Sequence, residues 1–477
     1  MTVVILDAPE VLQRSLADLF GSRGDTCRML PEQRTDTTAR PGDSSKASTL
    51  SARLARIAAA AALADCVIWF VYDRTSDDRS TAMAIAGALA GTNISQLIAV
   101  IPLRASRQPG AGHAPEWLSS ALANLRAPVS VVATTPVYGP GDELVSRLLI
   151  MMRSLPVVPL LAHGEREYQP VWHEDFAQLM VAAAHSEHVR AGTITVAGPE
   201  VVTQRLLYDR IAPLIDKRPL TVPIPDLLTR VGLSLIDVAS GTDTASDEGR
   251  WAVDADVVVL PAADSAIERM LGRRPTSIDE GLRRLVVDLP EQLPGTGLGT
   301  LQVKHFWADL RTPGLLPGTV IGLVRARFAD IMPVPVGIEP GAPVTRLDVG
   351  ATVTLYLPGR GHAQVRVEEA DDTHVVLSTL RGHPLAGVVR FLAAPARDGV
   401  RFEVMTADKA ATPLDWLGLS IGGARLQDAN WRTVVQRVAA MSGCEIDGVE
   451  SHVRNASDAE VHHLSTWVER LIAERTG

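Results

Sequence analysis

Two histidines in the first 200 residues are side chains suited to acid–base chemistry. His113 and His173 could form an acid–base cleft, because an imidazole changes its protonation state near neutral pH. His173 is followed by Glu174 and Asp175, and these carboxylates would equally suit the capped first turn of a helix. Catalysis and helix capping are therefore both open roles for this segment.

A second group of polar side chains surrounds the string STLRGHPLAGVVRF (378–391). Arg381, His383 and Arg390 could orient a ligand in a cleft, although strand alternation could also place them all outward. The alternative role of His383 is that of a turn residue held by Pro384.

The cysteines and the remaining histidines do not suggest a metal site. Cys27, Cys66 and Cys444 lie far apart, without a CxxC or Cys/His cluster, and fit a reducing cytoplasm. His462 and His463 would face different sides of a helix. We therefore expect neither a metal nor a disulfide framework. The N-terminus shows no secretory signal, so the expected location is cytoplasmic.

The overall composition favours a folded protein of two or three domains. The chain has 477 residues, of which 46% are hydrophobic and 21% charged, with a formal net charge of −9. No dense basic patch is present, which argues against a nucleic-acid partner. Asp65 and Arg153 interrupt the most apolar stretches, so no transmembrane helix is expected.

The first 200 residues alternate between apolar β-branched runs and helical stretches. Strands are predicted at 2–6, 65–72, 96–101, 129–134 and 192–198, and helices at 11–21, 52–63, 80–90, 116–125 and 144–153. Buried strands separated by helices predict a doubly wound, Rossmann-like parallel sheet. The polar stretch 31–49 is predicted to be a surface loop.

The rest of the chain has a different pattern of predicted helices and strands. Residues 200–290 are predicted to form a helical lobe, in which helix 227–240 would pack on the α/β domain or, alternatively, contact a membrane surface. The Pro/Gly-rich stretch 290–300 predicts a linker between domains 1–290 and 300–477. Beyond it, the predicted strands are 344–349, 351–356, 363–368, 373–380, 387–393 and 400–406, followed by helices 430–441 and 458–475. This order predicts an α+β domain with a curved sheet around a helix.

An ordered set of strings in the first domain resembles a known superfamily. The strings are VVILDAPEVLQRSL (3–16), PVYGPGD (136–142), EYQPVWHEDFAQLMVAAA (167–184), TVAGPE (195–200) and PIP (223–225). Together they resemble the extended and atypical short-chain dehydrogenases/reductases, the NAD-dependent epimerase/dehydratase group. The resemblance implies that Tyr138 belongs to the loop lining the substrate cleft, and that Asp175 orients its segment.

The expected dinucleotide turn departs from the pattern of that superfamily. The three glycines of the TGxxGxxG turn fall on Asp7, Glu10 and Gln13. A like-charge contact near 4 Å would cost about 4 kcal/mol at an effective dielectric constant of about 20. NAD(P) binding would therefore weaken by a factor of about a thousand, so NAD(P) is expected only if this degenerate turn still binds it.

The catalytic residues of the superfamily are also missing. Its Tyr-x-x-x-Lys pair has no counterpart, because no lysine occurs between Lys46 and Lys217. His113 and Trp117 stand about where the tyrosine and lysine would be. Ordinary dehydrogenase or epimerase chemistry is therefore not expected.

The string at 378–391 resembles a bacterial and plant domain family of unknown function with the signature GTLxGHPexGEExF, and that family resembles the START-like helix-grip fold. The resemblance covers residues ~340–445, but Val388 and Val389 replace the glutamates. It implies a cavity between sheet and helix, which suits an apolar or amphipathic ligand. Trp416 and Trp431 are expected to be packing residues.

Three hypotheses follow for the function. The first is a non-catalytic pseudoenzyme that binds a small apolar or lipid-like molecule through its C-terminal domain. The second is an NAD(P)-dependent epimerase or oxidoreductase with a divergent site, and the third is a structural partner in a biosynthetic complex.

Overall fold

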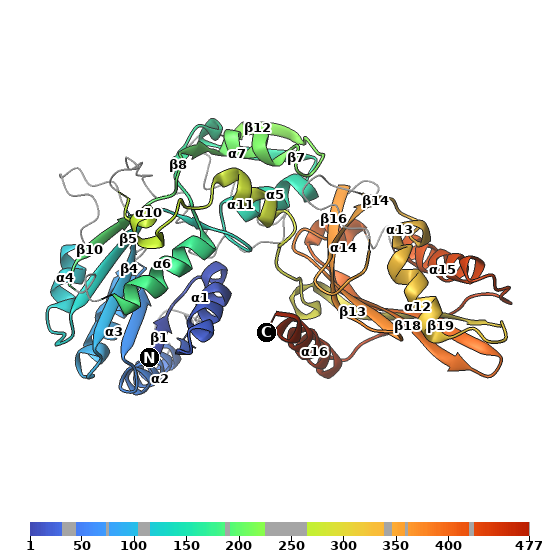
Figure 1. Ribbon diagram of the computed structural model, residues 1–477, viewed down its shortest axis with the longest axis horizontal. Helices are drawn as coiled ribbons and strands as arrows, with labels where there is room; N and C mark the ends of the chain where they lie inside the picture. Colours follow the sequence, from blue (N-terminus) through green and yellow to red (C-terminus); the bar gives the residue numbers. More distant parts are fainter. Residues whose placement is uncertain are drawn as a thin grey trace. The chain divides into compact units, whose positions relative to one another are not determined.

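The computed structural model describes residues 1–30, 44–72, 76–103, 115–186, 191–224, 265–337, 346–357, 361–418 and 424–476. The chain divides into two compact units (Figure 1). Unit 1 comprises Met1–Ser146, Gly164–Leu207 and Ser246–Gly281, and unit 2 comprises Arg147–His163, Tyr208–Ala245 and Leu282–Gly477. The domain boundary expected near 290–300 stays a prediction. The two units do not divide the chain at that point, because residues 147–163 and 208–245 belong to the same unit as the C-terminal part.

Unit 1 is built on a six-stranded sheet in which every strand pair is parallel. Its strands, in spatial order, are β2 (Thr26–Leu30), β1 (Thr2–Leu6), β3 (Cys66–Phe70), β4 (Gln96–Pro102), β5 (Val129–Thr134) and β10 (Thr193–Val196). The order reverses direction at β1, which lies between β2 and β3. A parallel sheet wound in both directions is the Rossmann-like α/β architecture, and its switch point is where such sheets form a crevice.

Helices cover both faces of this sheet, as the continuous apolar strands predict. The helices are α1 (Glu10–Ser22), α2 (Ser44–Ala61), α3 (Ser76–Ala90), α4 (Glu116–Leu122) and α6 (His173–His185). Alternate residues of β1 point to opposite faces: Val4 and Leu6 pack with α2, α3 and α4, whereas Val3 and Ile5 pack with α1 and α6. Figure 1 shows the two layers.

The sequence located five of these six strands correctly. It missed β2, an edge strand whose residues alternate between exposed and half-buried until Leu30, so that no apolar run marks it. The prediction of a loop over 31–49 was wrong from Ser44 onward, because α2 begins there.

The region between 136 and 285 contains short paired strands as well as helices. The strand pairs are β6 (Val137–Tyr138) with β9 (Val171–Trp172), β8 (Glu167–Tyr168) with β11 (Val202–Thr203), and β7 (Val157–Leu161) with β12 (Leu220–Ile224). The helices are α5 (Val145–Ser154), α7 (Gln204–Ile211), α10 (Ile267–Leu271) and α11 (Ile278–Leu285). Three of these helices (α7, α10 and α11) lie in the region predicted to be mainly helical, and the strand at 220–224 was not predicted. Helix 227–240 lies outside the described residues.

Unit 2 contains an eight-stranded sheet in which every strand pair is antiparallel. Its strands, in spatial order, are β14 (Val336–Gly337), β15 (Thr352–Leu357), β16 (Gly361–Ala370), β17 (His374–Thr379), β18 (Leu385–Ala396), β19 (Gly399–Ala410), β13 (Leu298–Leu310) and β20 (Glu450–Asn455). The predicted strands corresponding to β15–β19 are confirmed. The strand predicted at 344–349 is wrong for its described residues 346–349, which form a turn region.

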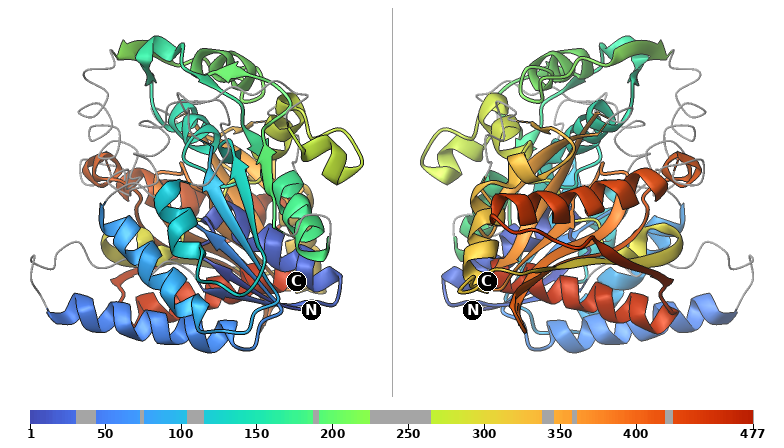
Figure 2. Two further views of the ribbon diagram at one scale, coloured as in Figure 1. Left: turned by 90° about the vertical axis from the view of Figure 1, so that its left-hand side faces the viewer. Right: turned by 90° about the vertical axis from the view of Figure 1, so that its right-hand side faces the viewer.

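Each face of this sheet carries helices (Figure 2). On one face, α12 (Pro317–Ala326), α13 (Phe328–Ile331) and α15 (Ala424–Met441) enclose the larger apolar core. On the other face, α16 (Asp458–Thr476) packs on a smaller cluster containing Leu301, Val388, Ala407 and Val468.

The segment predicted to be a linker is packed within unit 2. Pro294 is buried in the short 3-10 helix Pro294–Thr296, and β13 begins at Leu298. A Cβ atom on Gly297 would collide with Lys409 and Ala386. Glycine is needed at this position for close approach to the sheet.

Candidate functional site

The turn after β1 places an acidic side chain at the switch point of the parallel sheet. Asp7 has a left-handed backbone (φ +57°), a conformation that favours glycine, and its side chain is only 6% exposed. Its Oδ1 atom lies 2.5 Å from Nη2 of Arg53 on α2. The Tyr72 hydroxyl donates to the main-chain oxygen of Asp7 at 3.1 Å.

Glu10 and Gln13 complete the same turn. Glu10 is the first residue of α1, and the Gln13 Nε2 atom donates to the Ala8 carbonyl at 2.9 Å. A helix N-terminus favours negative charge, and here side chains of the protein supply that charge. The turn therefore leads directly into the N-terminus of α1 and holds an internal ion pair.

His173 lies at the start of α6 in contact with α1. Its Nδ1 atom is 2.8 Å from Ser15 Oγ, and its ring lies 4.4 Å from that of Trp172. A Cβ atom on Gly139 would collide with the His173 ring, so glycine allows the loop after β6 to pack here. The proposed partner His113 lies outside the described residues.

Tyr138 is placed as a packing residue. Its side chain is buried, and its ring meets that of Trp172 edge to face at 5.2 Å. The hydroxyl lies against Gly281, where a Cβ atom would collide with it.

Asp142 closes the loop that follows Tyr138. Its buried carboxylate accepts hydrogen bonds from the backbone N–H groups of Gly139, Leu144, Val145 and Ser146. Burial raises the pKa of Asp142. The hydrogen bonds from the four backbone N–H groups lower this pKa but do not cancel the rise. This geometry caps the start of α5 and fixes the loop.

The acidic pair after His173 does not cap its own helix, so that prediction was wrong. The N-cap residue of α6 is Trp172, without a side-chain cap bond. Asp175 instead binds a distant segment: it accepts from Arg273 Nη2 at 2.6 Å and from the Thr276 backbone N–H at 2.5 Å. Its role is to hold residues 273–276 against α6.

Unit 2 contains a cavity between its sheet and the helices α13 and α15. Its volume is about 70 Å³, several times the 10–15 Å³ that one ordered water needs. The lining is apolar over most of its surface: Phe328, Met332, Leu355, Val365, Leu377, Leu385, Gly387, Val388, Val389, Phe391 and Trp431. Thr379, His383, Thr406, Asp408 and Gln427 supply polar groups.

A buried ion pair lies at the polar part of this cavity. Lys304 Nζ is 3.2 Å from Asp408 Oδ1, and both side chains are nearly inaccessible. Thr406 Oγ1 donates to Asp408 Oδ2 at 2.9 Å, and Gln427 Nε2 donates to the same atom at 3.1 Å. Lys304 also donates to Gln427 Oε1. The sheet and α15 are thereby joined by a charged cluster within apolar surroundings.

Of the ligand contacts predicted in this unit, only His383 lines the cavity. Its Nδ1 atom accepts from the Leu385 backbone N–H at 3.0 Å, so it is a turn residue as well as a lining residue, and its contact with a ligand stays a prediction. Arg381 and Arg390 are not among the described residues that line it.

Lys304 and Gln427 were not among the predicted site residues, and of the two tryptophans predicted to pack, Trp431 does pack against the apolar core. Trp431 lines the cavity, whereas the Trp416 side chain is 53% exposed. Lys304 could have been noticed, because it precedes Phe306, Ala308 and Leu310 at the inward spacing of β13.

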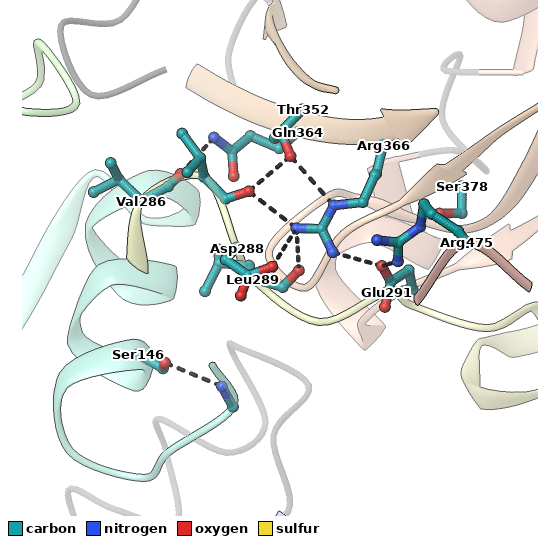
Figure 3. Close-up of polar contacts among 12 residues, drawn as sticks. Ser146, Val286, Asp288, Leu289, Glu291, Thr352, Gln364, Arg366, Ser378 and Arg475 are labelled. Atoms are coloured by element: carbon teal, nitrogen blue, oxygen red, sulfur yellow. Dashed lines mark hydrogen bonds and ion pairs between the residues drawn. The ribbon is translucent and has the colours of Figure 1, made fainter. Parts of the chain in front are cut away.

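The opposite face of the same sheet holds a network of buried arginines and glutamates (Figure 3). Arg366 of β16, 2% exposed, pairs with Glu291 at 2.5 Å and donates to the carbonyls of Val287 and Leu289. Arg475 of α16 pairs with Glu291 at 2.6 Å and with Glu368 at 2.7 Å.

Ser378 donates to Glu368 Oε1 in this network. Burial raises the pKa of Glu368, with a further rise from the neighbouring Glu291 charge. The network fastens α16 and residues 287–291 to the sheet.

The described residues hold no group of three or more His, Cys, Asp or Glu side chains placed for a metal ion. Among the helices the structure describes, none is long and apolar enough to cross a membrane.

Comparisons with known proteins give only distant likenesses. No protein-family model and no curated protein matches the chain. Three solved structures each cover 60% of this chain: an NAD-dependent NDP-hexosamine 5,6-dehydratase involved in tunicamycin biosynthesis (11% identity, 96% of that chain, TM-score 0.41), a UDP-glucuronic acid 4-epimerase from Bacillus cereus (13%, 98%, 0.40) and a Citrobacter triphenylmethane reductase complexed with NADP(H) (11%, 100%, 0.42). At these identities and TM-scores they carry no argument about the chemistry of this chain.

Proposed function

We propose that this protein binds a small, largely apolar molecule in the cavity of its antiparallel unit. The single observation that carries the proposal is the apolar cavity itself, which is lined by the sheet and by residues of α13 and α15 and contains a few polar groups. Small-molecule sites in proteins have this composition, and a cavity with these walls gains free energy when an apolar group displaces weakly held water.

The arrangement of the elements supports a helix-grip interpretation of this unit. Strand β13 is followed by α12 and α13, then by the run β14–β19, and β13 pairs with β19. The long helix α15 follows and packs against β13 and β19. A curved sheet that holds a long helix in this way leaves a ligand cavity between them.

Native mass spectrometry of the freshly purified chain, followed by solvent extraction, tests the proposal. We expect a bound apolar molecule that is lost in Leu385→Trp, because a larger side chain at this lining residue fills the cavity. The control is Leu316→Trp, at a residue that is 64% exposed. Equal retention of the molecule by both variants would contradict the proposal.

We propose further that the α/β unit of this protein works without a dinucleotide. The Asp7–Arg53 pair supports this, because a pyrophosphate at the turn would meet the Asp7 carboxylate. Calorimetric titration with NADH and NADPH should show no binding below millimolar concentrations. Micromolar binding would instead favour an NAD(P)-dependent epimerase or oxidoreductase.

A further inference from the structure

The two edges of the antiparallel sheet differ in length. At one edge, β14 has two residues. At the other edge, β20 has six residues, and all six pair with successive residues of β13 without a bulge. Proteins commonly shorten or bulge the last strand of a sheet, because the unpaired backbone groups of a regular edge strand can pair with another chain. Strand β14 is shortened in this way, whereas β20 is a regular edge strand.

Strand β20 is also open to solvent. Five of its six residues are exposed, and only Ser451 is half-buried. Among the residues that the structure describes, β13 is the only strand paired with β20. The side of β20 that faces away from β13 therefore presents a row of backbone N–H and C=O groups to which another strand can add.

The side chains of β20 divide between the two faces of the sheet. Ser451 Oγ accepts a hydrogen bond from Arg432 of α15, whereas Arg454 forms an ion pair with Glu460 of α16 at 2.8 Å. Because side chains alternate along a strand, Glu450 lies on the same face as Arg454. The α16 face of β20 therefore carries a negative charge at its first residue and a positive charge four residues later.

This charge pattern is complementary to itself when a second β20 lies antiparallel beside the first. In a two-fold antiparallel pair, residues directly opposite each other lie on the same face. The register centred on His452 places Glu450 of each copy opposite Arg454 of the other, and opposite charges across two strands stabilise their pairing. A shift by two residues, the smallest that keeps the faces matched, removes both ion pairs.

We propose that β20 pairs antiparallel with the β20 of a second copy of this chain, so that the two antiparallel sheets join into one. Arg454 can hold both its own Glu460 and the Glu450 of the other copy, because a guanidinium has five N–H donors. Val453, 49% exposed in the single chain, would face Ser451 of the other copy. This surface lies outside the cavity, so the inference is independent of the proposed function.

Charge reversal in the full chain tests the pairing and its register. Glu450→Arg brings two arginines together at each end of the contact, and Arg454→Glu brings two glutamates together. Each variant alone should therefore dimerise roughly tenfold or more weakly than the unaltered chain. An equimolar mixture of the two variants restores opposite charges at both ends and should recover the dimer.

The matched control is Glu469→Arg, which makes the same change of charge at an exposed residue of α16. It should dimerise like the unaltered chain. Analytical ultracentrifugation at chain concentrations up to about 100 μM measures the association and detects dissociation constants up to about that value. An unaltered chain that stays monomeric over this range would overturn the proposal, as would a dimer that both reversals leave unchanged. A mixture that associates as weakly as the single variants would overturn the register.

Hydrogen exchange in the unaltered chain gives a second measurement that needs no variant. The amides of residues 450–455 should exchange more slowly at concentrations where the dimer forms than at concentrations where the chain is monomeric. Equal exchange of these amides at both concentrations would place the contact elsewhere on the molecule and overturn the proposal.

Discussion

Asp7 Oδ1 in the turn after β1 and Arg53 Nη2 on α2 lie 2.5 Å apart, with side chains 6% and 11% exposed. The pair joins residues 46 positions apart at the switch point of the parallel sheet. A helix N-terminus at such a point commonly receives a phosphate. In this protein the turn before that helix carries a buried carboxylate that is already paired with an arginine.

Removal of Arg53 should destabilise the α/β unit. Arg53→Met removes the cation that lies 2.5 Å from the buried Asp7 carboxylate, which should lower the free energy of unfolding by about 3 kcal/mol. Asp7→Asn together with Arg53→Met should recover most of that loss. Urea denaturation measures both, with the exposed Arg56→Met as a control expected within about 0.5 kcal/mol of the unaltered chain. A loss in the double variant as large as in Arg53→Met would contradict the ion-pair explanation.

Arg475 should hold α16 against the sheet. Arg475→Met removes the cation shared by Glu291 and Glu368, so the amides of residues 458–476 should exchange hydrogen faster than in the unaltered chain. Arg470→Met is the matched control on the same helix, because its ion pair with Glu474 is exposed and 3.8 Å long. Equal exchange rates in the two variants would mean that packing alone holds the helix.

Glu368 should make stability depend on pH in a defined direction. Because burial raises its pKa in the folded state, the folded protein binds this proton at a higher pH than the unfolded chain does. Its contribution is therefore fully present below the ordinary glutamate pKa of about 4.3 and is lost as the pH rises through the raised value. We expect the free energy of unfolding of the unaltered chain, minus that of Glu368→Gln, to be larger at pH 4.5 than at pH 8. A difference that grows toward pH 8 would reverse the sign and contradict this assignment.

Ser457 and Glu460 should initiate α16 by a reciprocal cap. The Glu460 side chain accepts from the Ser457 backbone N–H at 2.9 Å, and Ser457 Oγ accepts from the Glu460 N–H at 3.4 Å. Ser457→Ala should lower the free energy of unfolding by about 1 kcal/mol, whereas Ser457→Asn should retain the cap.

The same cap provides a spectroscopic check. Hydrogen bonds from Arg454 and then from Ser457 hold the pKa of Glu460 at about 2. An NMR titration of the Glu460 carboxyl carbon should give that value in the unaltered chain and a higher one in Arg454→Met. An unchanged midpoint in that variant would show that the Arg454 contact is not made in solution.

The sequence by itself determined the strands that are marked by apolar or β-branched runs. The parallel strands are buried on both faces and therefore appear as continuous β-branched stretches, and β15–β19 appear as short strands separated by tight turns. The turn at Asp7 was also visible, because its position depends only on where β1 ends and α1 begins.

Only the tertiary structure decided which side chains meet. Arg53 reaches Asp7 across 46 residues, Lys304 reaches Asp408 across 104, and Arg475 reaches Glu368 across 107. Local periodicity reports which face of a strand or helix is buried, but it contains no information about which distant residue lies opposite. Strand β13 was missed although its residues alternate between buried and half-buried from Lys304 to Leu310, and only the tertiary structure decided that it pairs with β19, late in the chain.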